Sequence, residues 1–241
     1  MVHSRFFGTL SVLFIIFFIL LAIEPFDRKD WLLENILVFF AALILATTYR
    51  KFPFSRISYS LIFLFLILHE MGAHYTYAQV PYEKFFMDYF GFSVNNLFGW
   101  ERNNYDRVVH FIYGLFLAYP IRELYYRIAN TKGFWGYFFP LELTMASSMV
   151  FELFEWGAAE LVGGDLGAAY LGTQGDVWDA HKDMALASLG AAIAMFITVM
   201  VNLRLQRNFD EEWDKSLSVK YKEPLGEDKI EEMLEEDAKN L

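Results

Sequence analysis

Six long apolar stretches, separated by polar segments, set the pattern of this chain. The first, FFGTLSVLFIIFFILLAI, runs from Phe6 to Ile23 and holds 18 residues without a charge. A helix rises about 1.5 Å per residue, so a helix of this length suits a hydrocarbon layer of about 30 Å. The pattern predicts six membrane-spanning helices, at roughly 6–23, 31–49, 57–77, 105–127, 140–161 and 183–204.

The first span has Arg5 before its apolar run, as a secretory signal peptide does. It is longer than the apolar region of a typical signal peptide, and no small-x-small cleavage site precedes Glu24. We therefore expect a retained helix. The whole pattern predicts an all-α membrane protein, a polytopic bundle of about six transmembrane helices over residues 1–205. An acidic, largely solvent-exposed cytoplasmic tail is expected over residues 206–241.

Composition supports a membrane protein and excludes several kinds of chemistry. The chain is 56% hydrophobic and 19% aromatic, which exceeds the usual content of a soluble domain. It contains no cysteine, so disulfides, iron–sulfur clusters and thiolate chemistry are excluded. The net charge of −10 is concentrated in the tail, and no basic stripe is present. We therefore expect no nucleic-acid partner.

The distribution of Lys and Arg predicts the orientation in the membrane. With the N-terminus inside, the cytoplasmic loops carry nine of these residues before the tail, against six on the outer side. Lys and Arg are enriched in cytoplasmic loops, so both termini are expected to be cytoplasmic.

Ionisable residues of four spans fall at one membrane level, toward the outer side. These residues are His69, Glu70 and His74; Asp106 and His110; Glu152 and Glu155; and Asp176, Asp179 and Asp183. Within each set the main spacings are three, four or seven residues, which place side chains on one face of a helix. We expect the four sets to meet inside the bundle.

This cluster is strongly acidic, and that points to a bound cation. Seven carboxylates face only Arg102, Arg107 and Lys182 at this level, and they cannot all stay ionised near hydrocarbon without a cation, protons or water. Imidazole with carboxylates is a ligand set for a divalent metal, here zinc, iron or manganese. The predicted metal ligands are Glu70, His74, Asp106, His110, Asp176, Asp179 and Asp183.

The remaining residues of the cluster receive the other roles of a catalytic site. Glu152 and Glu155 are the candidate catalytic residues, with Glu155 as a general base toward metal-bound water. Arg102, Arg107 and His69 are candidates for substrate binding. The function expected from this arrangement is a metal-dependent membrane hydrolase or a related lipid-modifying enzyme. Its partners would be the lipid bilayer and a lipid or small-molecule substrate.

Two alternatives use the same residues differently. The arginines could pair with Asp106 or Asp176 and tie helix ends together, as in a noncatalytic membrane scaffold. A small proton- or ion-coupled transporter could instead use the carboxylates and imidazoles as a path. The inner halves of the later spans offer mainly hydroxyl groups and one amide, which disfavours a continuous polar path.

Four segments in order resemble the YjdF family of bacterial inner-membrane proteins, a domain of unknown function designated DUF2238. They are HEMGAHYTYAQVPY at 69–82, RNNYDRVVHFIYG at 102–114, FELFEW at 151–156 and GDLGAAYLGTQGDVWDAHKDM at 164–184. The resemblance covers about residues 6–205 and excludes the acidic tail. It implies a multi-pass protein of the bacterial inner membrane and carries over no catalytic residues.

Overall fold

A computed structural model describes residues 2–164, 167, 171–220 and 226–239. Part of the segment over 164–184 and part of the predicted tail therefore lie outside the described residues. Within the described ranges the secondary structure is helical, with no strand. The predicted all-α fold class is confirmed.

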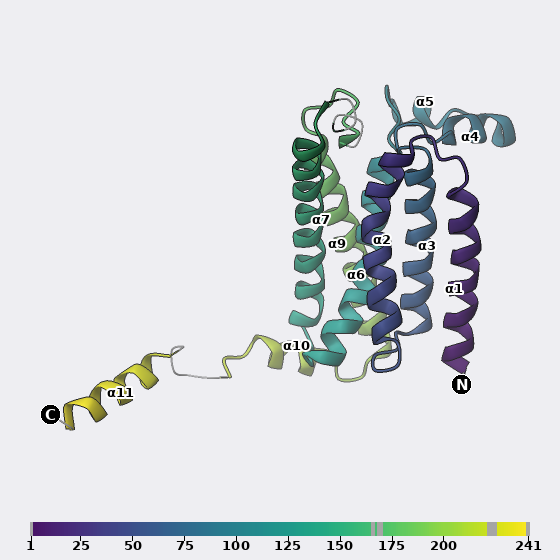
Figure 1. The fold of residues 1–241 in the computed structure, drawn as a ribbon. Coiled ribbons are helices and arrows are strands. Elements are labelled where there is room, and N and C mark those ends of the chain that lie inside the picture. Colours follow the sequence, from purple (N-terminus) through teal and green to yellow (C-terminus); the bar gives the residue numbers. More distant parts are fainter. Residues whose placement is uncertain (1, 165–166, 168–170, 221–225, 240–241) are drawn as a thin grey trace.

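Six long helices lie side by side and alternate in direction (Figure 1). They are α1 (Val2–Leu21), α2 (Arg28–Thr48), α3 (Arg56–His74), α6 (Tyr105–Ile128), α7 (Trp135–Val162) and α9 (Asp179–Leu205). We call the end at which α6 and α9 begin the upper end, as it appears in Figure 1, and the opposite end the lower end.

Shorter helices flank this bundle at both ends. The connection over 78–104 contains α4 (Tyr82–Phe90) and α5 (Val94–Phe98), which lie across the upper end (Figure 1). At the lower end, α10 (Phe209–Leu217) follows α9 and packs its Phe209 into the core beside Tyr137 and Ala194. The last helix, α11 (Glu227–Lys239), exposes the side chains that the structure describes.

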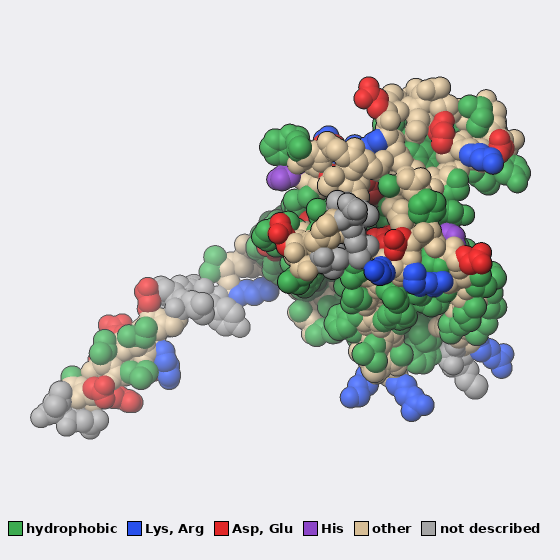
Figure 2. Space-filling view, turned by 45° about the horizontal axis from the view of Figure 1, so that its top comes forward, with side chains coloured by type: hydrophobic (Ala, Val, Ile, Leu, Met, Phe, Trp, Pro, Cys, Tyr) green, Lys and Arg blue, Asp and Glu red, His purple; other side chains and the backbone are tan. Residues whose placement is uncertain are grey.

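The sides of the bundle are apolar. Helices α2, α3 and α9 are long and apolar enough to cross a membrane, and α1 has a shorter apolar stretch over Arg5–Leu21. Large side chains such as Leu20, Phe40 and Phe196 point outward and are exposed. Figure 2 shows hydrophobic side chains over the sides of the bundle and Lys or Arg side chains projecting from its lower end. This surface is suited to lipid.

Small residues allow α6 and α9 to pack closely. A Cβ atom added at Gly114 of α6 would overlap the backbone carbonyl of Ala187, and one added at Gly190 would overlap that of Phe111. Ala118 and Ala191 are fully buried in the same contact. In lipid, small residues at a helix contact let the backbones approach and gain dispersion energy. This close contact places the upper ends of α6 and α9 side by side.

Candidate functional site

The upper ends of α6, α7 and α9 bring together the acidic residues of three predicted sets. Two groups of three side chains have ligand atoms within 4.8 Å of one another: His110, Glu152 and Asp183, and Asp106, Asp179 and Asp183. Asp106 and His110 lie one turn apart on α6, and Asp179 and Asp183 lie one turn apart on α9. Because the two helices run together, the pairs form two layers.

The outer layer is an ion-pair network, which we define as Asp106, Asp176 and Asp179 with Arg102, Arg107 and Lys182. Arg102 is its centre: one guanidinium nitrogen donates to Asp106 at 2.7 Å and to Asp179 at 2.6 Å. Another nitrogen of Arg102 donates to the carbonyl of Thr173 at 2.7 Å. Three carboxylates thus face three cations, and this layer is close to neutral.

Asp176 joins this network from outside the helix. The expectation that Asp176 shares a helix face with Asp179 and Asp183 is wrong, because α9 begins only at Asp179. Asp176 lies in the preceding turn and accepts a hydrogen bond from the backbone N–H of Trp178 at 3.0 Å. Lys182, this N–H and Arg107 all donate to its carboxylate, and they hold the pKa of Asp176 well below its usual value.

The inner layer, which we define as His110, Glu152 and Asp183, has no such compensation. His110 Nε2 lies 3.6 Å from Glu152 Oε1, beyond hydrogen-bond distance. Glu152 Oε1 and Asp183 Oδ1 are buried without a hydrogen-bond partner among the described residues. The Glu152 side chain is only 9% exposed. Among the described side chains, two buried carboxylates and an imidazole therefore face one another with no cation hydrogen-bonded to them.

Glu155 lies next to this layer. It follows Glu152 by three residues on α7, so the two side chains share a face of the helix. Glu155 is partly buried. The structure thus places both predicted catalytic carboxylates at the inner layer.

Three predicted site residues on α3 are not among the two groups of close ligand atoms. His74 contacts the carbonyl of Leu21 through Nδ1 at 2.7 Å, which ties α3 to the end of α1. His69 contacts the hydroxyl of Tyr77 at 2.5 Å and the carbonyl of Glu34 at 3.3 Å, so both ring nitrogens have partners. Glu70 is 0% exposed, and neither of its carboxylate oxygens has a hydrogen-bond partner in the described part of the chain.

The surroundings of Glu70 include residues that the sequence analysis missed. Asp30, Glu34 and Asn35 of α2 are buried, and Asn35 lies beside Glu70. Asp30 and Glu34 are four residues apart, the same spacing that identified the pairs on α6 and α9. A charge inside the second span, Glu34, is the feature of the sequence that would have identified them. Five helices, not four, contribute acids at this level.

The inner layer has the composition of a metal site with an open position. Zinc bound at about 2.1 Å in a tetrahedron holds its ligand atoms about 3.4 Å apart. The ligand atoms of the inner layer lie within 4.8 Å of one another, so small side-chain movements would bring them to the separation that zinc requires. One nitrogen and two oxygen ligands suit zinc, iron or manganese. The outer layer is less suited, because arginines already occupy its carboxylates. Of the predicted ligands, His110 and Asp183 thus lie in the inner layer, Asp106, Asp176 and Asp179 in the outer layer, and Glu70 and His74 in neither.

Comparisons with known proteins agree with the membrane architecture. The family described as "Predicted membrane protein (DUF2238)" matches residues 6–204. The chain is 36% identical over 188 residues to the inner membrane protein YjdF of Escherichia coli strain K12, and the match covers 78% of this chain and 86% of that protein. No solved structure matches the chain.

Proposed function

We propose that this chain, which belongs to the DUF2238 family of predicted membrane proteins, is a metal-dependent membrane hydrolase or a related lipid-modifying enzyme. It is a multi-pass protein of a bacterial inner membrane, so the bilayer is its immediate partner. A divalent ion, zinc, iron or manganese, binds the inner layer of His110, Glu152 and Asp183.

The proposal rests on one observation. The inner-layer carboxylates, Glu152 and Asp183, are buried without a basic partner among the described residues, one turn below outer-layer carboxylates that pair with arginine. An isolated carboxylate in a medium of low dielectric is unfavourable unless a cation or a proton neutralises it. The arginines of the outer layer do this for Asp106 and Asp179. Glu152 and Asp183 have no equivalent partner among the described side chains. A divalent ion would satisfy both carboxylates and the free nitrogen of His110.

The neighbouring residues suit hydrolysis. A bound divalent ion supplies a water of lowered pKa as the nucleophile. Glu155 lies one turn from Glu152 and would act as the general base toward such a water. The outer layer holds the N-terminal ends of α6 and α9 in place through Arg102 and Arg107, so these two arginines act as positioning residues.

The surface of α7 favours a lipid substrate over a soluble one. Leu153, Phe154 and Trp156 lie between and beside the two glutamates in sequence, and all three are exposed on the apolar side of the bundle. This side of α7 therefore faces the lipid, which is where we expect the substrate to bind. With cytoplasmic termini, the site would open toward the outer side of the inner membrane. A reporter fused to the C-terminus tests that orientation.

The transport alternative has less support. Below the site, the buried hydroxyl of Thr144 donates to the carbonyl of Pro140 at 2.7 Å, within its own helix. Ala118, Ala191 and Ala194 fill the contact further down. These alanines form a packed apolar contact below the site, and the nearby hydroxyls of Tyr113 and Ser147 are hydrogen-bonded to each other at 2.6 Å.

The proposed reaction is tested on purified protein in vesicles of phosphatidylethanolamine and phosphatidylglycerol. Zinc, manganese or iron(II) is supplied, and lipid products are followed by mass spectrometry. We expect metal-dependent product formation that Glu155→Gln lowers by about 100-fold or more while metal binding persists. Unchanged lipids with every metal would reject the hydrolase. An exposed carboxylate on the same helix gives the control variant, Glu160→Gln, which should keep its activity.

A further inference from the structure

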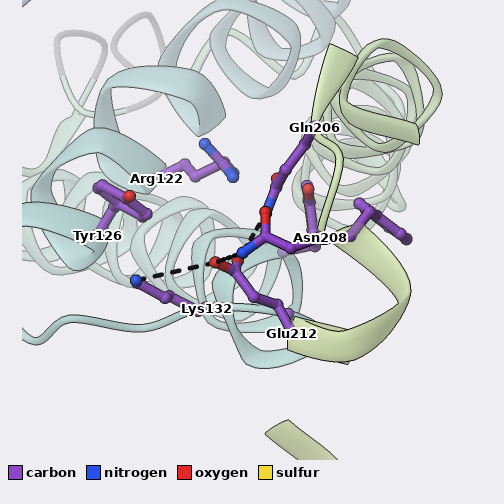
Figure 3. Close-up of a pocket in the computed structure, with 9 residues that line it drawn as sticks. Arg122, Tyr126, Lys132, Gln206, Asn208 and Glu212 are labelled. Atoms are coloured by element: carbon purple, nitrogen blue, oxygen red, sulfur yellow. Dashed lines mark hydrogen bonds and ion pairs between the residues drawn. The ribbon is translucent and has the colours of Figure 1, made fainter. Parts of the chain in front are cut away.

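A second site lies at the lower end of the bundle, away from the acidic layers. A pocket of about 220 Å³ opens between the end of α6, the loop before α7 and the segment from α9 to α10. Figure 3 shows Arg122 and Lys132 entering from one side and Gln206, Asn208 and Glu212 from the other. This volume is smaller than a typical drug site and suits a compact polar group.

Arg122 is the main reason to assign a ligand to this pocket. Its guanidinium carbon lies 4.7 Å from the ring centre of Tyr137 and 5.9 Å from that of Tyr126. In the described part of the chain it forms no ion pair, and its Nε is buried without a hydrogen-bond partner. Arginine normally directs its planar donors at a carboxylate or phosphate. Here the aromatic rings hold the guanidinium in place while its donors stay available.

Arg127 of the same helix, by comparison, has both an ion-pair partner and a backbone hydrogen-bond acceptor. Its guanidinium pairs with Glu123 at 2.8 Å and donates to the carbonyl of Pro53 at 2.5 Å. Both residues lie near the end of α6. Arg122, five residues earlier on the same helix, has no such partner among the described residues, although it lines the pocket.

The carboxylate in the pocket does not neutralise Arg122. Glu212 accepts hydrogen bonds from Gln206 at 2.7 Å and from Asn208 at 3.0 Å. Lys132 is 3.8 Å from the same carboxylate, at the outer limit of an ion pair. Two cations thus line the pocket against one anion, which leaves a net positive charge.

The walls of the pocket are fixed by close packing. Gly133 has a φ of 56°, and a Cβ atom there would overlap the carbonyl of Glu212. Ser216 of α10 accepts a hydrogen bond from the N–H of Phe134 at 2.9 Å, and its carbonyl accepts one from the indole of Trp135 at 2.8 Å. These contacts hold α10 against the loop before α7. The site is therefore formed before any ligand binds.

We propose that this pocket binds a phosphate-type anion, with Arg122 as the principal cation and Lys132 as the second. The phosphate belongs either to an anionic lipid headgroup at the membrane surface or to a small soluble molecule. This proposal does not depend on the metal site.

The test uses the full chain and two phosphate sources. In dodecyl maltoside, inorganic phosphate is titrated at constant ionic strength while the apparent Tm is read from intrinsic fluorescence. In nanodiscs, phosphatidylglycerol is compared with phosphatidylcholine. We expect the anion to raise the apparent Tm by about 3–6 °C at about ten times its Kd in at least one arm. A response to phosphate assigns a soluble ligand, and a response only to phosphatidylglycerol assigns a lipid.

Variants of two arginines make the test specific. Arg122→Gln should lose the shift, and Arg127→Gln, the matched control, should keep it even if its own Tm is lower. Arg122→Lys keeps the charge but not the planar donors, so its apparent Kd should rise about tenfold. If Arg122→Gln does not fold, Arg122→Lys alone tests the role of Arg122. An equal shift in the Arg122 variants and the wild type, or no shift in either arm, overturns the proposal.

Discussion

The two layers at the upper end use the same helices and the same residue types, yet their electrostatics differ. The outer layer places Asp106, Asp176 and Asp179 against Arg102, Arg107 and Lys182. The inner layer, one turn deeper, has carboxylates and an imidazole without a described cation. Acids at membrane depth therefore have two explanations. Paired acids stabilise the helix ends, and unpaired acids require a ligand or a proton.

The largest expected difference between the layers is in metal affinity. Asp183→Asn removes a ligand from the inner layer and should weaken metal binding by about 100-fold or more. Asp106→Asn, one turn away in the outer layer, should weaken it by about tenfold at most, because it only supports the site. Competition with a fluorescent chelator measures both constants. Equal losses in the two variants would mean that the layers do not have separate roles.

The next effect is on stability and concerns Arg102. Arg102→Met leaves Asp106 and Asp179 buried without their shared cation, which should lower the free energy of unfolding by about 3–5 kcal/mol. Urea unfolding in mixed micelles, followed by circular dichroism, measures this loss. Lys182→Met is the control: its side chain is 49% exposed, so its pair should contribute less than about 1 kcal/mol. A smaller loss for Arg102 than for Lys182 would contradict the outer layer as a structural network.

A third prediction concerns the close contact that aligns the layers. Gly114→Val adds a side chain where the Ala187 carbonyl lies, so α6 and α9 must separate, at a cost of about 1–3 kcal/mol. Metal affinity should fall with it. Gly157→Ala, in α7, meets no atom within 4 Å and should be neutral. Thermal unfolding of both variants distinguishes the cases, and an unaltered Tm in Gly114→Val would show that the contact is not tight.

The smallest expected effect is the pH dependence due to Asp176. The pKa of Asp176 is lower in the folded protein than in the unfolded chain. Its contribution to the free energy of unfolding is therefore fully present above the ordinary pKa of 3.8. This contribution is lost as the pH falls below that value toward the folded pKa. Asp176→Asn should therefore show a smaller fall in Tm between about pH 5 and pH 3 than the wild type. An identical fall in both proteins would mean that Lys182 and Arg107 do not stabilise the ionised form.

Much of the fold follows from the sequence, because hydrophobic length is a local property. The predicted spans 57–77 and 105–127 correspond to α3 and α6 within a few residues. The start of α7 at Trp135 was placed late, because aromatic residues before Pro140 continue the helix. The predicted span 183–204 lies within α9, which begins at Asp179, after the Asp176 that the spacing had assigned to the same helix.

The site was predicted only in part, because spacing gives the face of a helix but not its neighbour. Asp106 and His110 lie one turn apart on α6, and Glu152 and Glu155 lie three residues apart on α7, as the spacing predicts. The spacing could not show that α3 directs His74 toward α1. Pairing of the arginines with Asp106 and Asp176 was stated as an alternative, and Arg102–Asp106 and Arg107–Asp176 both form. The pairing of arginines with one layer and not the other depends on tertiary contacts. The predicted site residues do not include Glu34, although this acid lies inside the second predicted span.

Metal content of the purified protein tests the central claim most directly. The full chain is prepared in detergent without chelators, and bound metals are counted by inductively coupled plasma mass spectrometry. We predict about one divalent ion per chain in the wild type and in His181→Ala, whose histidine is exposed, with loss in His110→Ala. A wild-type protein free of metal, or a His110→Ala variant with the same content as the wild type, would contradict the inner layer as a metal site.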